Sequence, residues 1–180
     1  MSLSTTFVDP KAVMQETGML PGNIVADFGC GAGFFSIESA RIVGDEGRVY
    51  ALDVLPSALE AIESQAKALG LRNIVATRVN IEREEGSKLP PNSVDWVIAK
   101  DVFFQNQNRD IMMREIARIL KSGGQALIME WNPDDMGIGP EVSVRVSRDE
   151  LKSLATATGL SIDRNILVGA FHYAFVVKKA

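Results

Sequence analysis

The chain has 180 residues, a formal net charge of −4 at pH 7 and a pI near 5.1. With 46% apolar residues it is long enough to bury the core of one domain, and its acidic balance argues against a protein that binds nucleic acid by neutralising phosphates. The single cysteine, Cys30, leaves no disulfide framework and no thiol-based metal site.

The N-terminal stretch carries no recognisable targeting signal. Residues 1–10 lack the charged and apolar segments of a signal peptide, and no uncharged apolar run approaches the roughly 20 residues that span a bilayer. We therefore expect a soluble cytoplasmic domain without membrane insertion. The first predicted element is a helix over residues 9–19, with Asp9 as its N-cap and Pro10 at its first position.

Short apolar runs then alternate with helix-like segments. The apolar runs predict strands over residues 23–28, 48–53, 73–79, 93–99 and 125–131. Helices are predicted over 33–43, 56–70 and 108–124, the last of them with Gly123 as its C-cap. Ser147 and Glu150 have capping-box spacing ahead of a further helix over 151–159. Residues 160–178 predict two strands joined near Gly169-Ala170.

This order of elements predicts an α/β fold. Strands that alternate with helices form βαβ units, whose parallel sheet is covered by helices on both faces. The two terminal strands have no helix between them, so we expect them to form an antiparallel pair at one edge of the sheet.

A glycine-rich loop follows the first strand. The stretch VADFGCGAGFFS, residues 25–36, carries Gly29, Gly31 and Gly33, and ligands of open α/β sheets bind beyond the carboxyl ends of the strands. Asp53 ends the second strand, 20 residues after Gly33, at the spacing where a carboxylate accepts hydrogen bonds from ribose hydroxyls. The alternative is that Asp53 is only the N-cap of the helix near Pro56. The combination predicts a nucleoside-containing cofactor.

The same loop favours a cationic ligand over a pyrophosphate. Phe34 stands where a dinucleotide fingerprint needs its third glycine. Asp27, just before the turn, would repel a pyrophosphate but attract an ammonium or a sulfonium. S-adenosylmethionine, which carries both cations, is therefore a better match than NAD(P), although an NAD(P)-dependent oxidoreductase stays as the weaker alternative.

Four motifs in order resemble the class I S-adenosylmethionine-dependent methyltransferases, especially those of the ubiquinone/menaquinone-biosynthesis type. They are VADFGCGAGFFS, VYALDV, NSVDWVIAKDVFFQ and ILKSGGQALIMEW, and the resemblance runs from about residue 20 to the C-terminus. It implies a Rossmann-like three-layer α/β/α sandwich with a seven-stranded, mostly parallel sheet whose last strand is antiparallel. It also implies one domain over 1–180, with an N-terminal helical segment (1–20) and a cofactor-binding core (21–180).

The resemblance also implies a cofactor site. Asp27 and the loop backbone would hold the methionine portion, and Asp53 would bind the ribose. Asn80 stands where the family usually has an aspartate that binds the adenine amino group, and an amide oxygen can accept the same bond. Lys100 either pairs with the methionine carboxylate or is a solvated lysine at a strand end. The expected cofactor-binding set is Asp27, Gly29, Cys30, Gly31, Gly33, Asp53, Val54, Asn80, Ile81 and Lys100.

Catalytic residues are harder to identify, because methyl transfer needs a general base only if the acceptor must lose a proton. Asp101 and Gln105 follow the fourth strand and Glu130 ends the fifth, so all three are candidates to face the pocket; the alternative is capping and solvent exposure. His172 is expected to be structural, and Cys30 is not expected to be a nucleophile. Phe103 and Phe104 either line a substrate slot or pack in the core, where Trp96 is also expected.

The acceptor is expected to be a small molecule. The stretch AKDVFF, residues 99–104, is not the Asn/Asp-Pro-Pro-aromatic motif of amino-group nucleic-acid methyltransferases. Only residues 132–146 separate the fifth strand from the next helix, which predicts a pocket that is open or completed by a second copy or a partner subunit. A non-catalytic module that binds S-adenosylmethionine and regulates or completes a partner is the other function we consider.

Overall fold

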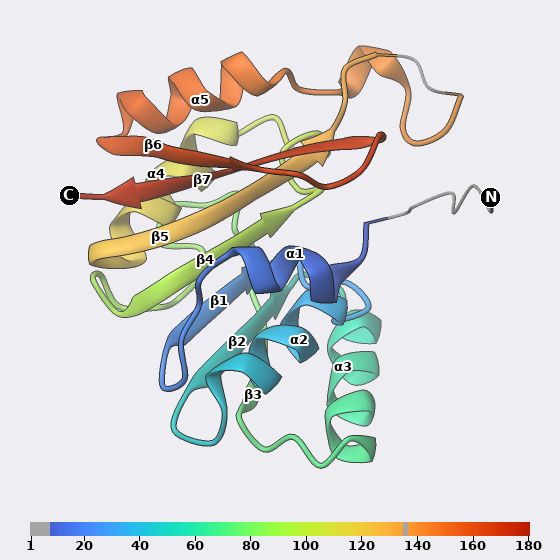
Figure 1. Cartoon of the computed structure of the whole chain (residues 1–180), viewed down its shortest axis with the longest axis vertical. Coiled ribbons are helices and arrows are strands. Elements are labelled where there is room, and N and C mark those ends of the chain that lie inside the picture. Colours follow the sequence, from blue (N-terminus) through green and yellow to red (C-terminus); the bar gives the residue numbers. More distant parts are fainter. Residues whose placement is uncertain (1–7, 135–136) are drawn as a thin grey trace.

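The fold is a seven-stranded sheet between two layers of helices (Figure 1). The computed structural model describes residues 8–134 and 137–180. The strands lie in the order β3-β2-β1-β4-β5-β7-β6. Their bounds are β1 (Ile24–Phe28), β2 (Arg48–Asp53), β3 (Ile74–Arg78), β4 (Val94–Lys100), β5 (Leu120–Trp131), β6 (Leu160–Ile166) and β7 (His172–Lys179).

Helices cover both faces, as the alternation of elements predicts. On one face α1 (Pro10–Glu16), α2 (Phe34–Val43) and α3 (Pro56–Ala68) bury apolar side chains against the sheet. On the other face α4 (Arg109–Ile119) and α5 (Arg148–Ala157) do the same, and a short 3-10 helix, η1 (Val142–Val144), precedes α5. Within the part of the chain that the structure describes, no helix has the length and apolar character needed to cross a membrane.

The terminal strands confirm the predicted antiparallel pair and refine its place. β7 lies between β5 and β6 and runs antiparallel to both, while β6 forms the edge of the sheet. The amino end of β7 therefore lies at the same edge as the carboxyl ends of the parallel strands, with His172 opposite Trp131.

The boundary between α4 and β5 differs from the prediction. The helix ends at Ile119, because Leu120 adopts extended backbone angles and pairs with Val94 of β4. Pairing then shifts to Trp96 opposite Gln125, so residues 121–124 form an irregularity in the strand. Gly123, with φ of +77°, serves this bulge rather than a helix C-cap.

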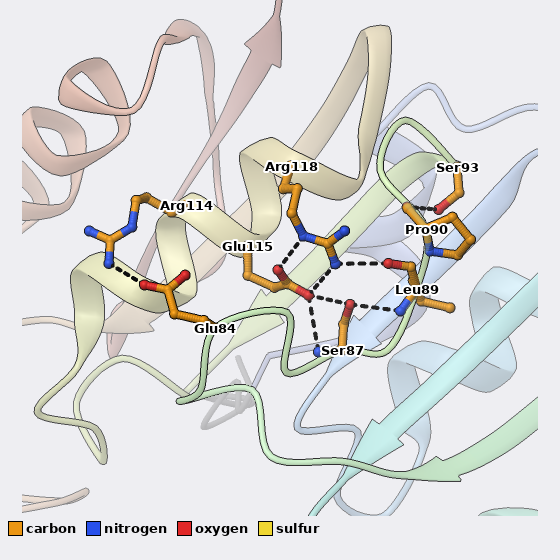
Figure 2. A network of polar contacts seen from close by, with 8 residues as sticks. All are labelled: Glu84, Ser87, Leu89, Pro90, Ser93, Arg114, Glu115 and Arg118. Carbon is orange, nitrogen blue, oxygen red and sulfur yellow. Dashed lines mark hydrogen bonds and ion pairs between the residues drawn. The ribbon is translucent and has the colours of Figure 1, made fainter.

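The connection from β3 to β4 contains no helix, and a polar network attaches it to α4 (Figure 2). The carboxylate of Glu115, on α4, accepts hydrogen bonds from the Ser87 N–H at 3.0 Å and from the Arg118 guanidinium at 2.8 Å. Arg118 also donates to the Leu89 carbonyl at 2.8 Å. Although burial raises the pKa of Glu115, the bonds from Arg118 and Ser87 outweigh it and hold that pKa below its ordinary value. The network thus fixes the segment that follows the third strand.

Candidate functional site

A cavity of about 620 Å³ lies beyond the carboxyl ends of β1, β2 and β4, where the strand order reverses. This is the predicted ligand position for an open α/β sheet. Of the predicted cofactor residues, only Gly33 is absent from the cavity lining. The others line it: Asp27, Gly29, Cys30, Gly31, Asp53, Val54, Asn80, Ile81 and Lys100. Asp101, Gln105, Trp131 and His172 line its other end. Phe34, Val54 and Leu55 stay 63%, 52% and 57% exposed at its mouth, so the cavity is open to solvent.

The glycines bring the main chain close to the cavity wall. Gly29 has φ of +67°, and a Cβ there would lie 2.5 Å from Cγ1 of Val102, so no other residue fits without movement. Gly33 has φ of +81° and lies at the N-cap of α2, where a Cβ would be 2.7 Å from Cδ1 of Ile62. Gly33 therefore allows close packing of α2 on α3, behind the cavity.

Asp27 is a buried carboxyl with one side-chain partner among residues 8–134 and 137–180. Its side chain accepts a hydrogen bond from the Ser36 hydroxyl, and the residue is 3% exposed. Burial raises the pKa of Asp27 to about 7, and the negative charge of Asp53 adds to the rise, although Ser36 and Lys100 oppose it. A cation placed beside Asp27 would stabilise its ionised form.

Asp53 holds two backbone groups. Its Oδ2 accepts from the Gly31 N–H at 3.0 Å, and its Oδ1 accepts from the Leu55 N–H at 2.9 Å. The N-cap of α3 is Leu55, so the alternative that Asp53 caps this helix is wrong. Asp53 instead fixes the glycine loop and keeps further oxygen lone pairs for a ligand.

Asn80 and Ile81 line the cavity directly after the third strand. The Asn80 Oδ1 accepts a hydrogen bond from the Glu82 N–H at 3.0 Å, which orients the side chain. A second lone pair on the same oxygen remains, so the predicted contact with an adenine amino group is compatible with this geometry.

The other end of the cavity is built around Asp101. This residue has φ of +55°, which is rare for a residue other than glycine, and its N–H donates to the Met129 carbonyl at 3.0 Å. Its carboxylate forms an ion pair with Lys100 and lies 3.1 Å from Nε2 of His172. Burial raises the pKa of Asp101, but hydrogen bonds from His172 and Lys100 bring it below its ordinary value. Lys100 is thus paired with Asp101, while its side chain stays 27% exposed.

Glu130, a candidate to face the pocket, is absent from the cavity lining. It is fully buried, so the alternative of solvent exposure is wrong. Its Oε1 accepts from the Phe103 N–H at 2.7 Å, while burial and the neighbouring Asp101 charge raise its pKa to about 8. Through this hydrogen bond, Glu130 positions the segment that follows β4.

Other candidates are settled by burial. Phe103 is fully buried on the α4 side of the sheet, and the partly buried Phe104 packs against that cluster. Neither phenylalanine lines the cavity, so they form no substrate slot there. Trp96 is 5% exposed, as expected of a core residue. Burial raises the pKa of the Cys30 thiol far above its ordinary value, which leaves it protonated and unreactive.

His172 is the residue that sequence reasoning assigned to a structural role and that the structure places in the cavity. The centroid of its ring lies 4.2 Å from that of Trp131. The Arg145 guanidinium carbon lies 6.0 Å from the centroid of the same Trp131 ring. The only signal in the sequence was its place at the start of the last strand. The insertion of β7 beside β5, which brings it to the cavity, involves pairing over long sequence distances.

The fold and the cavity define a Rossmann-like domain with a ligand cleft at the switch point of its sheet. Residues 21–165 match the model of a family described as a methyltransferase domain, and the chain belongs to that family.

Individual relatives agree with this assignment. The chain is 30% identical over 120 residues to a demethylmenaquinone methyltransferase of Geobacillus stearothermophilus, a match that covers 67% of this chain and 50% of that protein. It is 30% identical over 122 residues to the ubiquinone/menaquinone biosynthesis C-methyltransferase UbiE of Hydrogenovibrio crunogenus, covering 68% and 47%. The chain thus spans about half the length of the curated relatives it matches. A SAM-dependent methyltransferase from Aquifex aeolicus superposes with a TM-score of 0.87 at 25% identity, covering 96% of this chain and 90% of that one.

Proposed function

We propose that the chain is an S-adenosylmethionine-dependent methyltransferase that acts on a small aromatic acceptor. The observation that carries the proposal is the buried Asp27 carboxyl beside a glycine loop in a cavity of about 620 Å³. Asp27 makes no ion pair within residues 8–134 and 137–180, so a cationic ligand would supply the positive partner that its carboxylate lacks. Family membership and the structural similarity support the same cofactor.

The residues present fit this cofactor. Gly29 and Gly31 line the cavity and present main chain to a ligand, and Asp53 lies across the loop with oxygen lone pairs free for ribose hydroxyls. Val54 and Ile81 offer apolar surface for a base, beside the Asn80 amide. When bound, S-adenosylmethionine supplies a methyl carbon on a sulfonium, and the C–S bonding pair returns to sulfur as the acceptor forms its new bond.

The acceptor end of the cavity suits a flat ring that bears an ionisable proton. Trp131 and Phe35 provide apolar surface, while Asp101 and Gln105 provide polar groups. The relatives named for demethylmenaquinone and for ubiquinone/menaquinone biosynthesis support a quinol-type ring as acceptor.

A non-catalytic module that binds the same cofactor is the second candidate. Residues 132–134 and 137–146 contribute nothing to the lining of the cavity, so the acceptor end has little cover of its own within the described chain. Completion of the pocket by a second copy or a partner, a cytoplasmic location and a single domain over 1–180 stay predictions.

Calorimetry with S-adenosylhomocysteine and with NADH tests the cofactor, and transfer of labelled methyl to 1,4-naphthoquinol tests the reaction. We expect binding of the first ligand only, together with turnover. Binding of NADH alone would contradict the proposal, and binding of S-adenosylhomocysteine with no transfer to any phenolic acceptor would favour the non-catalytic module.

A further inference from the structure

The acceptor end of the cavity contains the only histidine of the chain, His172. It is 6% exposed and lies at the start of β7, opposite Trp131 in the sheet. One face of its ring is covered by the Trp131 ring, at 4.2 Å between centroids. The ring therefore has a defined orientation at the cavity wall.

The Asp101 carboxylate fixes which ring nitrogen carries the proton. Nε2 of His172 lies 3.1 Å and 3.3 Å from the two oxygens of Asp101. The ion pair with Lys100 keeps the Asp101 carboxylate ionised, so this carboxylate can only accept hydrogen bonds. Nε2 must then be the donor, and the lone pair of the neutral ring lies on Nδ1. Within residues 8–134 and 137–180 the ring makes no other hydrogen bond.

Asp101 itself is held firmly in place. Its backbone has a left-handed conformation at the end of β4, its N–H donates to Met129, and its carboxylate is shared with Lys100. Such a conformation persists only where the surroundings determine it, and it is common at active sites.

We propose that His172 accepts, at Nδ1, the proton that the methyl acceptor loses, and that Asp101 is the positioning residue that orients its ring. This inference rests on the proposed function. As the acceptor's O–H or C–H bond breaks, its electron pair stays with the acceptor and the proton binds the Nδ1 lone pair, giving an imidazolium. The proton later leaves to water, so no other reactant is needed.

The charges around the ring suit this role. Asp101, from the end of β4, stabilises the imidazolium, while Lys100 on the same strand neutralises part of that carboxylate. The Arg145 guanidinium, which follows η1, lies 6.0 Å from the centroid of the Trp131 ring and adds a second cation near this end of the cavity.

The test that needs no acceptor is ¹⁵N NMR of the single histidine, which reports the tautomer of the neutral ring. We expect the Nε2–H tautomer in the natural chain and a mixture in Asp101→Ala. Asp95→Ala is the matched control, because Asp95 pairs with a lysine as Asp101 does, here Lys121, but lies at the other end of β4. It should leave the tautomer unchanged. An Nδ1–H tautomer in the natural chain would overturn the proposal.

The catalytic test uses His172→Gln, whose side-chain amide still donates to Asp101 but takes no proton. We expect S-adenosylhomocysteine affinity within about twofold of the natural chain, and methyl transfer to 1,4-naphthoquinol slower by about 10²–10⁴-fold in kcat. Added imidazole should rescue methyl transfer by His172→Ala. Unchanged kcat in His172→Gln would contradict the inference.

The proposed function can fail separately. If the natural chain does not bind S-adenosylhomocysteine, the proposed function is wrong. If it binds this ligand but does not methylate 1,4-naphthoquinol, the quinol acceptor is wrong, and the tautomer measurement then decides the inference alone.

Discussion

Asp53 accepts a hydrogen bond from the main-chain N–H of Gly31 at 3.0 Å, across 22 positions of sequence. The residue predicted to bind the ribose therefore also fixes the shape of the glycine loop. The two halves of the predicted nucleoside site, at the ends of β1 and β2, are joined through this one carboxylate.

Replacing Asp53 with alanine should weaken S-adenosylhomocysteine binding by about 1–3 kcal/mol, because both the ribose acceptor and the loop contact are lost. Calorimetry measures this change directly. Glu60→Ala, an exposed carboxylate on α3, is the control and should bind normally. Equal affinity in Asp53→Ala and the natural chain would show that Asp53 contacts no ligand.

Binding should release protons near neutral pH, because burial raises the pKa of Asp27 to about 7 and a cationic ligand favours its ionised form. Affinity for S-adenosylhomocysteine should rise with pH below that value, by up to about tenfold per unit. Calorimetry in phosphate and Tris buffers at pH 6.5 reports the released protons. In Asp27→Asn the release should vanish; its persistence would assign the proton to another group.

The free chain should show the matching effect on stability. The pKa of Asp27 is higher in the folded chain than its ordinary value of 3.8, so its contribution is fully present below about pH 4 and is lost as pH rises through 7. Urea unfolding should therefore show Asp27→Asn gaining stability relative to the natural chain over this range.

Gly29→Ala should lower the free energy of unfolding by about 1–3 kcal/mol more than Gly70→Ala does. Both glycines have a positive φ, +67° and +70°, so both variants carry backbone strain. Only at position 29 does the added methyl meet Val102, at 2.5 Å, while position 70 has nothing within 4 Å. Urea unfolding of the two variants isolates the clash, and equal losses would mean that Val102 moves aside freely.

Glu115→Ala should lower the free energy of unfolding by about 2–3 kcal/mol at pH 7, because Ser87 and Arg118 lose a buried acceptor. The folded pKa of Glu115 lies below its ordinary value of 4.5, so this contribution is present above that value and lost as pH falls through the folded pKa. The difference in free energy of unfolding between the natural chain and Glu115→Ala should therefore become smaller as the pH is lowered.

Asp110→Asn is the control for this network, because Asp110 lies on the same helix and pairs with Arg114 at 2.8 Å on the exposed surface. Its loss should leave the unfolding transition unchanged at pH 7. An equal effect of both substitutions would show that burial of Glu115 adds nothing.

Local signals sufficed for most of the fold. The second strand has the predicted bounds, Arg48–Asp53, because an apolar run is flanked by a glycine and a proline turn. Asp9 and Ser147 cap α1 and α5 as predicted, since an N-cap depends only on the next three residues. The predicted end of α4 was wrong because Leu120 pairs with Val94, a contact that local sequence does not encode.

The candidate site also has one part that local sequence predicts and another that depends on long-range contacts. Nearly every predicted cofactor residue lines the cavity, as expected from the loop motif and the ends of the strands, because parallel strands deliver these positions to one edge. The acceptor end could not, since it depends on the place of β7 in the sheet and on the pairing of Asp101 with His172. Glu130 was misplaced because side chains alternate along β5, and this one points to the α4 side.

The cavity is built from two separate stretches of the chain, and β7 completes the second of them. Apart from Val8 and Pro10, the residues that line the cavity come from two stretches of the chain, 27–82 and 100–172. The second stretch ends with His172, the first residue of β7, so the end of the cavity around Asp101 depends on where β7 enters the sheet. A chimera of two related chains joined between β3 and β4, where no helix must be matched, would exchange one of these stretches and keep the other.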